Sequence, residues 1–163
     1  MEFIDAAVND HERAKRLLEQ RPDLVDSRYI HGESVLHFLS IEGYSGAVEF
    51  LVAAGASVNS TDRFGDTPLI SAATLGEEAV AEVLLRAGAN PNAISETWSN
   101  PLHAAASNGH IGVMRLLLDA GARADYKDEL EQTIWTAIDA SRGDREAIVE
   151  MLALRGICRP TTS

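Results

Sequence analysis

A period of 33 residues constrains this chain of 163 residues more than any other feature. Hydroxyl or amide residues recur at this spacing, at Ser34, Thr67, Asn100 and Thr133. Glycines at positions 43, 76 and 109 keep the same step, and so do the Gly-Ala pairs that begin at 55, 88 and 121. Three independent markers with one period indicate repeated structural units, each too small to bury its apolar side alone.

Each unit has the pattern of two short helices joined by a tight turn. The hydroxyl or amide residue suits an N-cap, because its side-chain oxygen accepts from the free amides of the first helical turn. Pro68 and Pro101 follow at the first helical position, where a missing amide is harmless. A short alanine-rich helix then ends at a glycine such as Gly109, which can take a left-handed conformation. A second apolar helix and a polar, hairpin-like loop complete the unit, so the pattern predicts an all-α chain.

These motifs resemble the ankyrin repeat family. The family pattern Thr-Pro-Leu-His-x-Ala is nearly complete in residues 100–105, Asn-Pro-Leu-His-Ala-Ala, and partial in residues 67–72. The resemblance covers essentially the whole chain and implies one domain, residues 1–163, built as an ankyrin-repeat solenoid of about five stacked helix-turn-helix units. Residues 29–61, 62–94 and 95–127 resemble full repeats, and 1–28 and 128–163 resemble a degenerate N-terminal repeat and a C-terminal capping repeat.

The two terminal repeats are expected to depart from the pattern. In the first, the pairs Ala6-Ala7 and Leu17-Leu18 are expected at core positions. In the last, a two-residue insertion after Ala140 is needed to align Ile148, Val149, Met151 and Leu152 with the apolar positions of earlier repeats. Such departures fit end repeats, which must present a wetter outer face.

The composition favours an intracellular protein whose partner is another protein. With 25 acidic and 14 basic residues, the formal net charge is −11, so we expect no binding to nucleic acid or membranes, and a basic partner is the better electrostatic match. No apolar run approaches the roughly 18 residues of a membrane span, and the acidic N-terminus does not resemble a secretory signal. Cys158, the single cysteine, can form no internal disulfide. We expect a cytoplasmic protein, with a monomer favoured.

No motif in the sequence indicates catalysis, a bound metal or a cofactor. The chain lacks Gly-x-Ser-x-Gly, a phosphate-binding loop and Gly-x-Gly-x-x-Gly. His37 and His103 occupy the histidine position of the family, which implies rings that hydrogen-bond backbone between hairpin and helix. The acid pair Glu77-Glu78 is interpreted as negative charge at the positive, N-terminal end of a helix dipole and not as a general acid–base pair. We therefore expect a protein that is not an enzyme.

The resemblance places partner binding on the concave face, which is the surface formed by the loop tips and the first helix of each repeat. Several residues there are large and apolar where solvent favours polar ones, and acids lie among them. The candidate partner-binding residues, mapped by period, are Phe38, Ile41, Glu42, Phe64, Asp66, Leu75, Glu96 and Trp98. Apolar clusters rimmed by charge are typical of binding surfaces. The alternative is that these side chains close over each other and only extend the core.

Binding of another protein through the concave face is the first functional hypothesis. Residues 29–61 carry three acids and no lysine or arginine, so their charge would steer a cationic partner toward the apolar residues. A narrower form of this hypothesis is an inhibitor or antitoxin-like protein that neutralises a basic toxin or nuclease. Two hypotheses of other classes stay open: a structural subunit of a larger assembly, and a small-molecule-binding protein.

The bracing role implied for His103 is testable. Replacing His103 with alanine should lower the free energy of unfolding by about 1 kcal/mol, as expected for a lost buried hydrogen bond. Partner affinity should change only as far as the folded fraction changes. Urea denaturation and a binding titration of the same variant check this. A variant as stable as the wild type that no longer binds would show that His103 contacts the partner instead.

Overall fold

The computed structural model describes residues 2–29, 32–97, 99–127, 133–141 and 143–160. These residues form α-helices, one 3₁₀ helix and two isolated β-bridges, with no extended strand among them. The elements are α1 Glu2–Asn9, α2 His11–Gln20, η1 Pro22–Asp26, α3 Val35–Ile41, α4 Ser45–Ala53, α5 Pro68–Leu75, α6 Glu78–Arg86, α7 Pro101–Asn108, α8 Ile111–Asp119, α9 Ile134–Asp139 and α10 Arg145–Leu154. The prediction of an all-α chain of helix pairs is confirmed.

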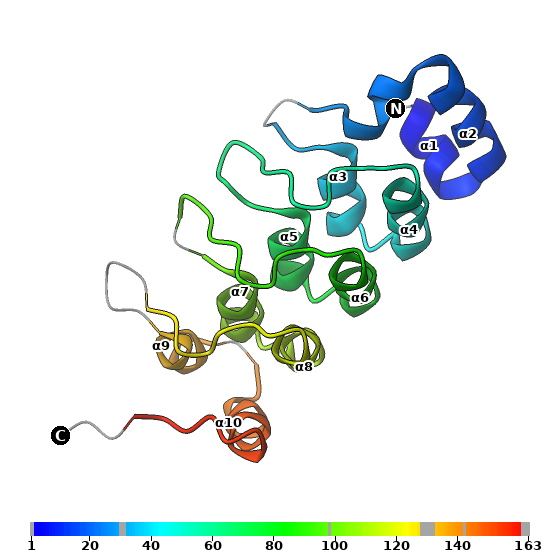
Figure 1. The fold of residues 1–163 in the computed structure, drawn as a ribbon. Coiled ribbons are helices and arrows are strands. Elements are labelled where there is room, and N and C mark those ends of the chain that lie inside the picture. The colour runs from blue at the N-terminus through cyan, green and yellow to red at the C-terminus, as the bar shows by residue number, and fades with distance from the viewer. Residues whose placement is uncertain (1, 30–31, 98, 128–132, 142, 161–163) are drawn as a thin grey trace.

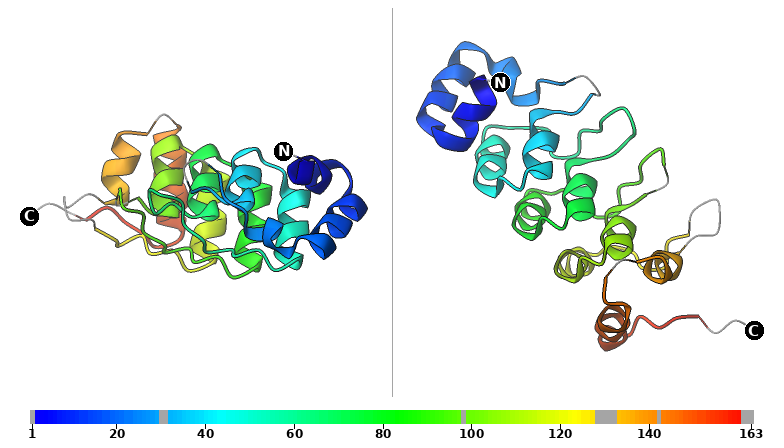
Figure 2. Two further views of the ribbon diagram at one scale, coloured as in Figure 1. Left: turned by 90° about the horizontal axis from the view of Figure 1, so that it is seen from above. Right: turned by 180° about the vertical axis from the view of Figure 1, so that it is seen from behind.

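The helices stand in two rows that run the length of the molecule (Figure 1). The first helices α3, α5, α7 and α9 lie beside the loops, and α4, α6, α8 and α10 form the other row. Within the rows, α3 to α9 contact their neighbours in turn, and so do α4 to α8. The loops between the pairs project from one side of the stack, as Figure 1 and Figure 2 show. Residues 33 apart therefore occupy equivalent places along one surface.

Each first helix begins at the residue that the period marked. The side chains of Ser34, Thr67, Asn100 and Thr133 all accept a hydrogen bond from a backbone amide in the first turn of the helix that follows. At the other end, Gly109 closes α7 in a left-handed conformation, with φ of 80°. The predicted N-caps and the predicted helix stop are confirmed. They place the start of each pair at a constant distance along the chain.

The core lies between the two rows of helices. Leu36, Leu69 and Leu102, spaced by 33 residues, are buried in successive first helices, and Trp135 takes the same place in α9. Val48, Leu51, Leu84 and Leu117 bury the inner sides of the second helices. Burial of a leucine side chain contributes about 1.5–3 kcal/mol. None of the helices in the described ranges is long and apolar enough to cross a bilayer.

A ladder of side-chain hydrogen bonds joins successive loops on the second-helix side. Asn59 Oδ1 accepts from the amide of Asn90 at 2.8 Å, and its Nδ2 donates to the carbonyl of Gly88 at 3.1 Å. Asn92 repeats both contacts one repeat later, and Asp26 accepts from the amide and the hydroxyl of Ser57. The period alone did not reveal this role, because it predicted only polar, hairpin-like loops in this part of each repeat.

His37 joins the second helix pair to the hairpin of the third. Its ring is fully buried, its Nδ1 accepts from the amide of Ser34 at 3.2 Å, and its Nε2 donates to the carbonyl of Asp66 at 2.9 Å. The two contacts require a neutral ring with its proton on Nε2. Burial lowers the pKa of His37, against the opposing effect of the Asp66 carbonyl. The predicted bracing role is therefore present at His37.

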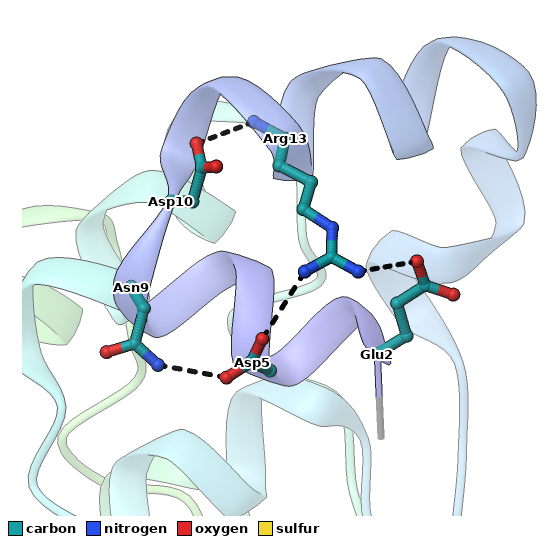
Figure 3. Close-up of polar contacts among 5 residues, drawn as sticks. All are labelled: Glu2, Asp5, Asn9, Asp10 and Arg13. Carbon is teal, nitrogen blue, oxygen red and sulfur yellow. Dashed lines mark hydrogen bonds and ion pairs between the residues drawn. The ribbon is translucent and has the colours of Figure 1, made fainter.

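The N-terminal pair packs differently from the others. Helix α1 contacts α4 of the next pair, and Ala6 and Ala7 are fully buried, as expected. Leu17 and Leu18, also expected in the core, are only partly buried. Ion pairs hold α1 to α2: Arg13 contacts Glu2 at 2.7 Å and Asp5 at 3.5 Å (Figure 3). Figure 3 also shows Asp10 accepting from the amide of Arg13, which caps α2.

The C-terminal pair is more open than the central pairs. Residues 140–144 connect α9 to α10, whereas only residues 109 and 110 separate α7 from α8. Helix α10 accordingly contacts α9 less extensively than α8 contacts α7. Ile148, Met151 and Leu152 are buried, but Val149 is exposed, unlike Met114, the residue that the insertion aligns with it. One of the four apolar positions aligned in α10 is therefore open to solvent.

The state of His37 predicts a dependence of stability on pH. Because burial lowers its pKa in the folded state, the stability from the neutral ring is present above the unfolded pKa of about 6.5 and is lost as the pH falls toward the lower folded value. Asp62, Glu33 and Arg28 are the charged groups that act on the ring. Replacing His37 with asparagine should lower the free energy of unfolding by about 2 kcal/mol at pH near 7.5 and by less at lower pH.

Urea denaturation of both proteins across the acid range measures this. Ile70→Val, which removes one buried methylene and no titrating group, is the control and should keep a constant deficit of about 1 kcal/mol. A deficit of His37→Asn that stays equally constant would contradict the neutral buried ring.

Candidate functional site

The concave face is built from the hairpin-like loops and the first helices. Each loop is closed by a backbone hydrogen bond with the same 33-residue spacing: Tyr29 to Glu33, Asp62 to Asp66 and Ser95 to Ser99, at 2.8–3.0 Å. The amide of Glu96 also donates to the carbonyl of Phe64 at 2.9 Å, so successive loops are joined to each other. The loop tips are thus held in a fixed order beside the helices.

The large apolar residues predicted for this face are half exposed. Phe38 and Ile41 on α3 each expose 36% of their surface, Phe64 at the second loop exposes 42%, and Leu75 on α5 exposes 49%. They are not closed over by their neighbours, which was the alternative interpretation. Trp98, the remaining apolar candidate, lies outside the described residues.

These residues concentrate on the second and third helix pairs. The position of Phe38 is Ser71 in α5 and Ala104 in α7, and the position of Ile41 is Thr74 and then Ser107. In α7, the side chain of Asn108 donates to the carbonyl of Ala104 at 3.0 Å. The apolar part of the concave face therefore lies over α3 and α5.

Two aromatic contacts enlarge this apolar surface beyond the predicted residues. Tyr29, exposed by 39%, lies beside Phe38 with 6.4 Å between ring centroids. The guanidinium of Arg63 lies 4.5 Å from the centroid of the Phe64 ring, which is a cation–π contact. Tyr29 was not among the predicted residues, although it lies 33 residues before Asp62, in the equivalent place of the preceding loop.

Asp66 is placed differently from a solvent-exposed rim acid. It is partly buried, its Oδ1 is buried with no hydrogen-bond partner among the described residues, and its amide donates to Asp62 Oδ1 at 3.0 Å. Burial and then the neighbouring Asp62 carboxylate raise the pKa of Asp66, while the Ser95 hydroxyl opposes them. Asp66 therefore belongs to the contacts between loops more than to the open surface.

Glu42 and Glu96 are exposed, as a rim requires. Neither carboxylate forms an ion pair within the described ranges, and the same holds for Glu33. In those ranges, ion pairs join side chains only within residues 2–23 or within residues 119–159. Residues 24–118 carry ten acids and four arginines, a formal charge of −6, so the acids beside the apolar surface are largely uncompensated.

The other chemical features of the molecule lie apart from this face. A groove of about 490 Å³ opens at the N-terminal end, lined by Leu18, Pro22, Val25 and Phe50 together with Lys15 and Glu19. Cys158 is exposed near the C-terminus. No group of three or more histidine, cysteine or acidic residues in the described ranges could hold a metal ion.

Comparisons with known proteins agree with the architecture. Residues 3–95 match a family model of ankyrin repeats in three copies, and residues 84–139 match a second model of ankyrin repeats in many copies. A segment of 64 residues is 39% identical to the serine/threonine-protein kinase VIK of Arabidopsis thaliana. That segment is 39% of this chain but 15% of the kinase, so the chain spans a small part of that relative. The matched repeats and the stack of helix pairs together establish that the chain belongs to the ankyrin repeat family.

Proposed function

We propose that this protein binds another protein through the second and third helix pairs of its concave face. Ankyrin repeats are in general protein–protein interaction modules and are typically non-catalytic. The observation that carries the proposal is the apolar row Phe38, Ile41, Phe64 and Leu75, which is 36–49% exposed on the loops and first helices of these two pairs. Large apolar side chains exposed on one face are typical of interaction sites.

The proposed contact surface contains the eight candidate residues in three roles. Phe38, Ile41, Phe64 and Leu75 supply apolar anchors, and Trp98 is proposed as a fifth. Glu42 and Glu96 supply negative charge, and Asp66 supports the loop that carries Phe64. Because the acids of the central repeats are uncompensated, a basic partner is favoured. A basic toxin or nuclease neutralised by this protein is one partner of that class.

Truncating the apolar anchors should lower the affinity for the partner without unfolding the protein. The double variant Phe38→Ala/Phe64→Ala should reduce affinity at least tenfold, because buried aromatic anchors contribute about 2 kcal/mol or more each. The measurement is capture of the natural partner from the native organism, followed by titration of the purified pair.

A matched control removes equally exposed apolar groups elsewhere. Val149→Ala/Leu154→Ala on α10 truncates side chains that are 44% and 82% exposed, and it should leave binding within about twofold of the wild type. Equal losses from both double variants, or full affinity in Phe38→Ala/Phe64→Ala, would remove the concave face as the binding surface.

A further inference from the structure

The groove at the N-terminal end lies where the second row of helices is interrupted. Helix α4 contacts α6, and α6 contacts α8, but α2 has no comparable contact with α4 in the described chain, and α1 contacts α4 instead. The groove, of about 490 Å³, is bounded by α2, η1 and α4, and Leu18, Val25 and Phe50 line it from these three elements.

The lining of this groove is mostly hydrocarbon that the chain leaves uncovered. Leu18, Val25 and Phe50 are only partly buried, and Ala53 at the end of α4 is exposed. One repeat later, the place of Phe50 is taken by Val83, which is buried in a helix with second-row neighbours on both sides. A further helix laid in the groove would close it in the same way.

Helix α10 offers such a helix surface at the other end of the molecule. Leu154 is 82% exposed, Val149 is 44% exposed, and Ala153 between them is exposed as well. With the two-residue insertion, Leu154 takes the place of Asp119 and Arg86, so the core does not require an apolar residue at this position. Several apolar side chains exposed together on one helix indicate a contact surface.

The two surfaces carry charge of opposite sign. Helix α2, one wall of the groove, has three basic and two acidic residues, whereas α10 has one basic and two acidic residues. Lys15 at the groove pairs only within its own helix, and Arg16 beside it forms no ion pair within the described ranges. Glu146 and Glu150 lie one turn apart on the exposed side of α10. In a chain of net charge −11, a basic wall favours an acidic occupant.

We propose that the N-terminal groove binds α10 of a second copy of this chain. The apolar side chains of α10 pack on the apolar lining, and Glu146 and Glu150 face Lys15 and Arg16. The two surfaces lie at opposite ends of the stack (Figures 1 and 2), so one molecule cannot fill its own groove. Each contact leaves a free groove and a free α10, so association continues head to tail and does not stop at a dimer.

This contact is independent of the proposed function, because it uses none of the apolar row on the concave face. It departs from the monomer that sequence analysis favoured, since the chain would be monomeric only at low concentration. Sedimentation velocity of the intact chain, from micromolar to millimolar concentration, measures it. The average mass should rise from the 17.6 kDa of one chain, pass the mass of a dimer and continue to rise.

Two variants remove the contact from opposite sides. The groove variant is Leu18→Gln/Ala53→Gln, and Arg86 at the position of Ala53 one repeat later shows that a long side chain is compatible with the fold there. The helix variant is Val149→Ala/Leu154→Ala. Each should lower the association constant at least about tenfold, because apolar burial is lost on one side of the contact. Circular dichroism checks that both are folded.

Mixing the two variants gives the sharpest outcome. The groove variant keeps an intact α10, and the helix variant keeps an intact groove, so the equimolar mixture should form a dimer that grows no further. The matched control Phe38→Ala/Phe64→Ala, on the concave face, should associate like the wild type.

Four results would each overturn the proposal. The first is a wild type that stays monomeric at every concentration, which would leave the groove to a different protein. The second is association of the folded groove or helix variant equal to that of the wild type. The third is a mixture of folded variants that stays monomeric, which would indicate a symmetric contact. The fourth is loss of association in Phe38→Ala/Phe64→Ala, which would place self-association on the concave face.

Discussion

Burial of each helix pair against its neighbours is the interaction on which the whole structure depends. Leu36, Leu69 and Leu102 occupy one position in successive repeats, and each is almost completely buried. The small residues around them, such as Ala72, Ala73 and Ala105, are also buried and allow the helices of the first row to approach closely. A pair removed from this stack would expose most of this surface to water, so the pairs are stable only together.

Polar contacts then determine how the pairs are placed relative to one another. The N-caps locate the start of each first helix, the Asn59 and Asn92 ladder joins the loops on one side, and His37 joins a helix to the next hairpin. Each of these contacts is formed by a residue at a defined position within its repeat. The ladder changes at the last repeat, where Asp125 pairs instead with Arg123 of its own loop at 3.1 Å. The same region has the longer α9–α10 connection and the looser contact of α10.

Sequence analysis predicted the parts of this structure that repeat. A cap such as Thr67 or Asn100 has one local role that spacing makes visible, so the helix starts followed from the period. Contacts between repeats were harder to predict, because they depend on which backbone group the next unit presents. The ladder residue Asn59 and the inward carboxylate of Asp66 are examples. The packing of α1 on α4 was also not predicted, because α1 precedes α3 by the same sequence spacing that separates the first helices of the central pairs.

The proposed function requires that the apolar row on the concave face is not part of the core and so is available to a partner. One helix provides a direct comparison, because α5 contains Leu69, which is fully buried, and Leu75, which is 49% exposed. The measurement is the free energy of unfolding of Leu69→Ala and Leu75→Ala by urea denaturation. We expect Leu69→Ala to lose about 2–5 kcal/mol and Leu75→Ala to lose less than about 1 kcal/mol. A comparable loss in Leu75→Ala would show that this side chain belongs to the core and would contradict the account.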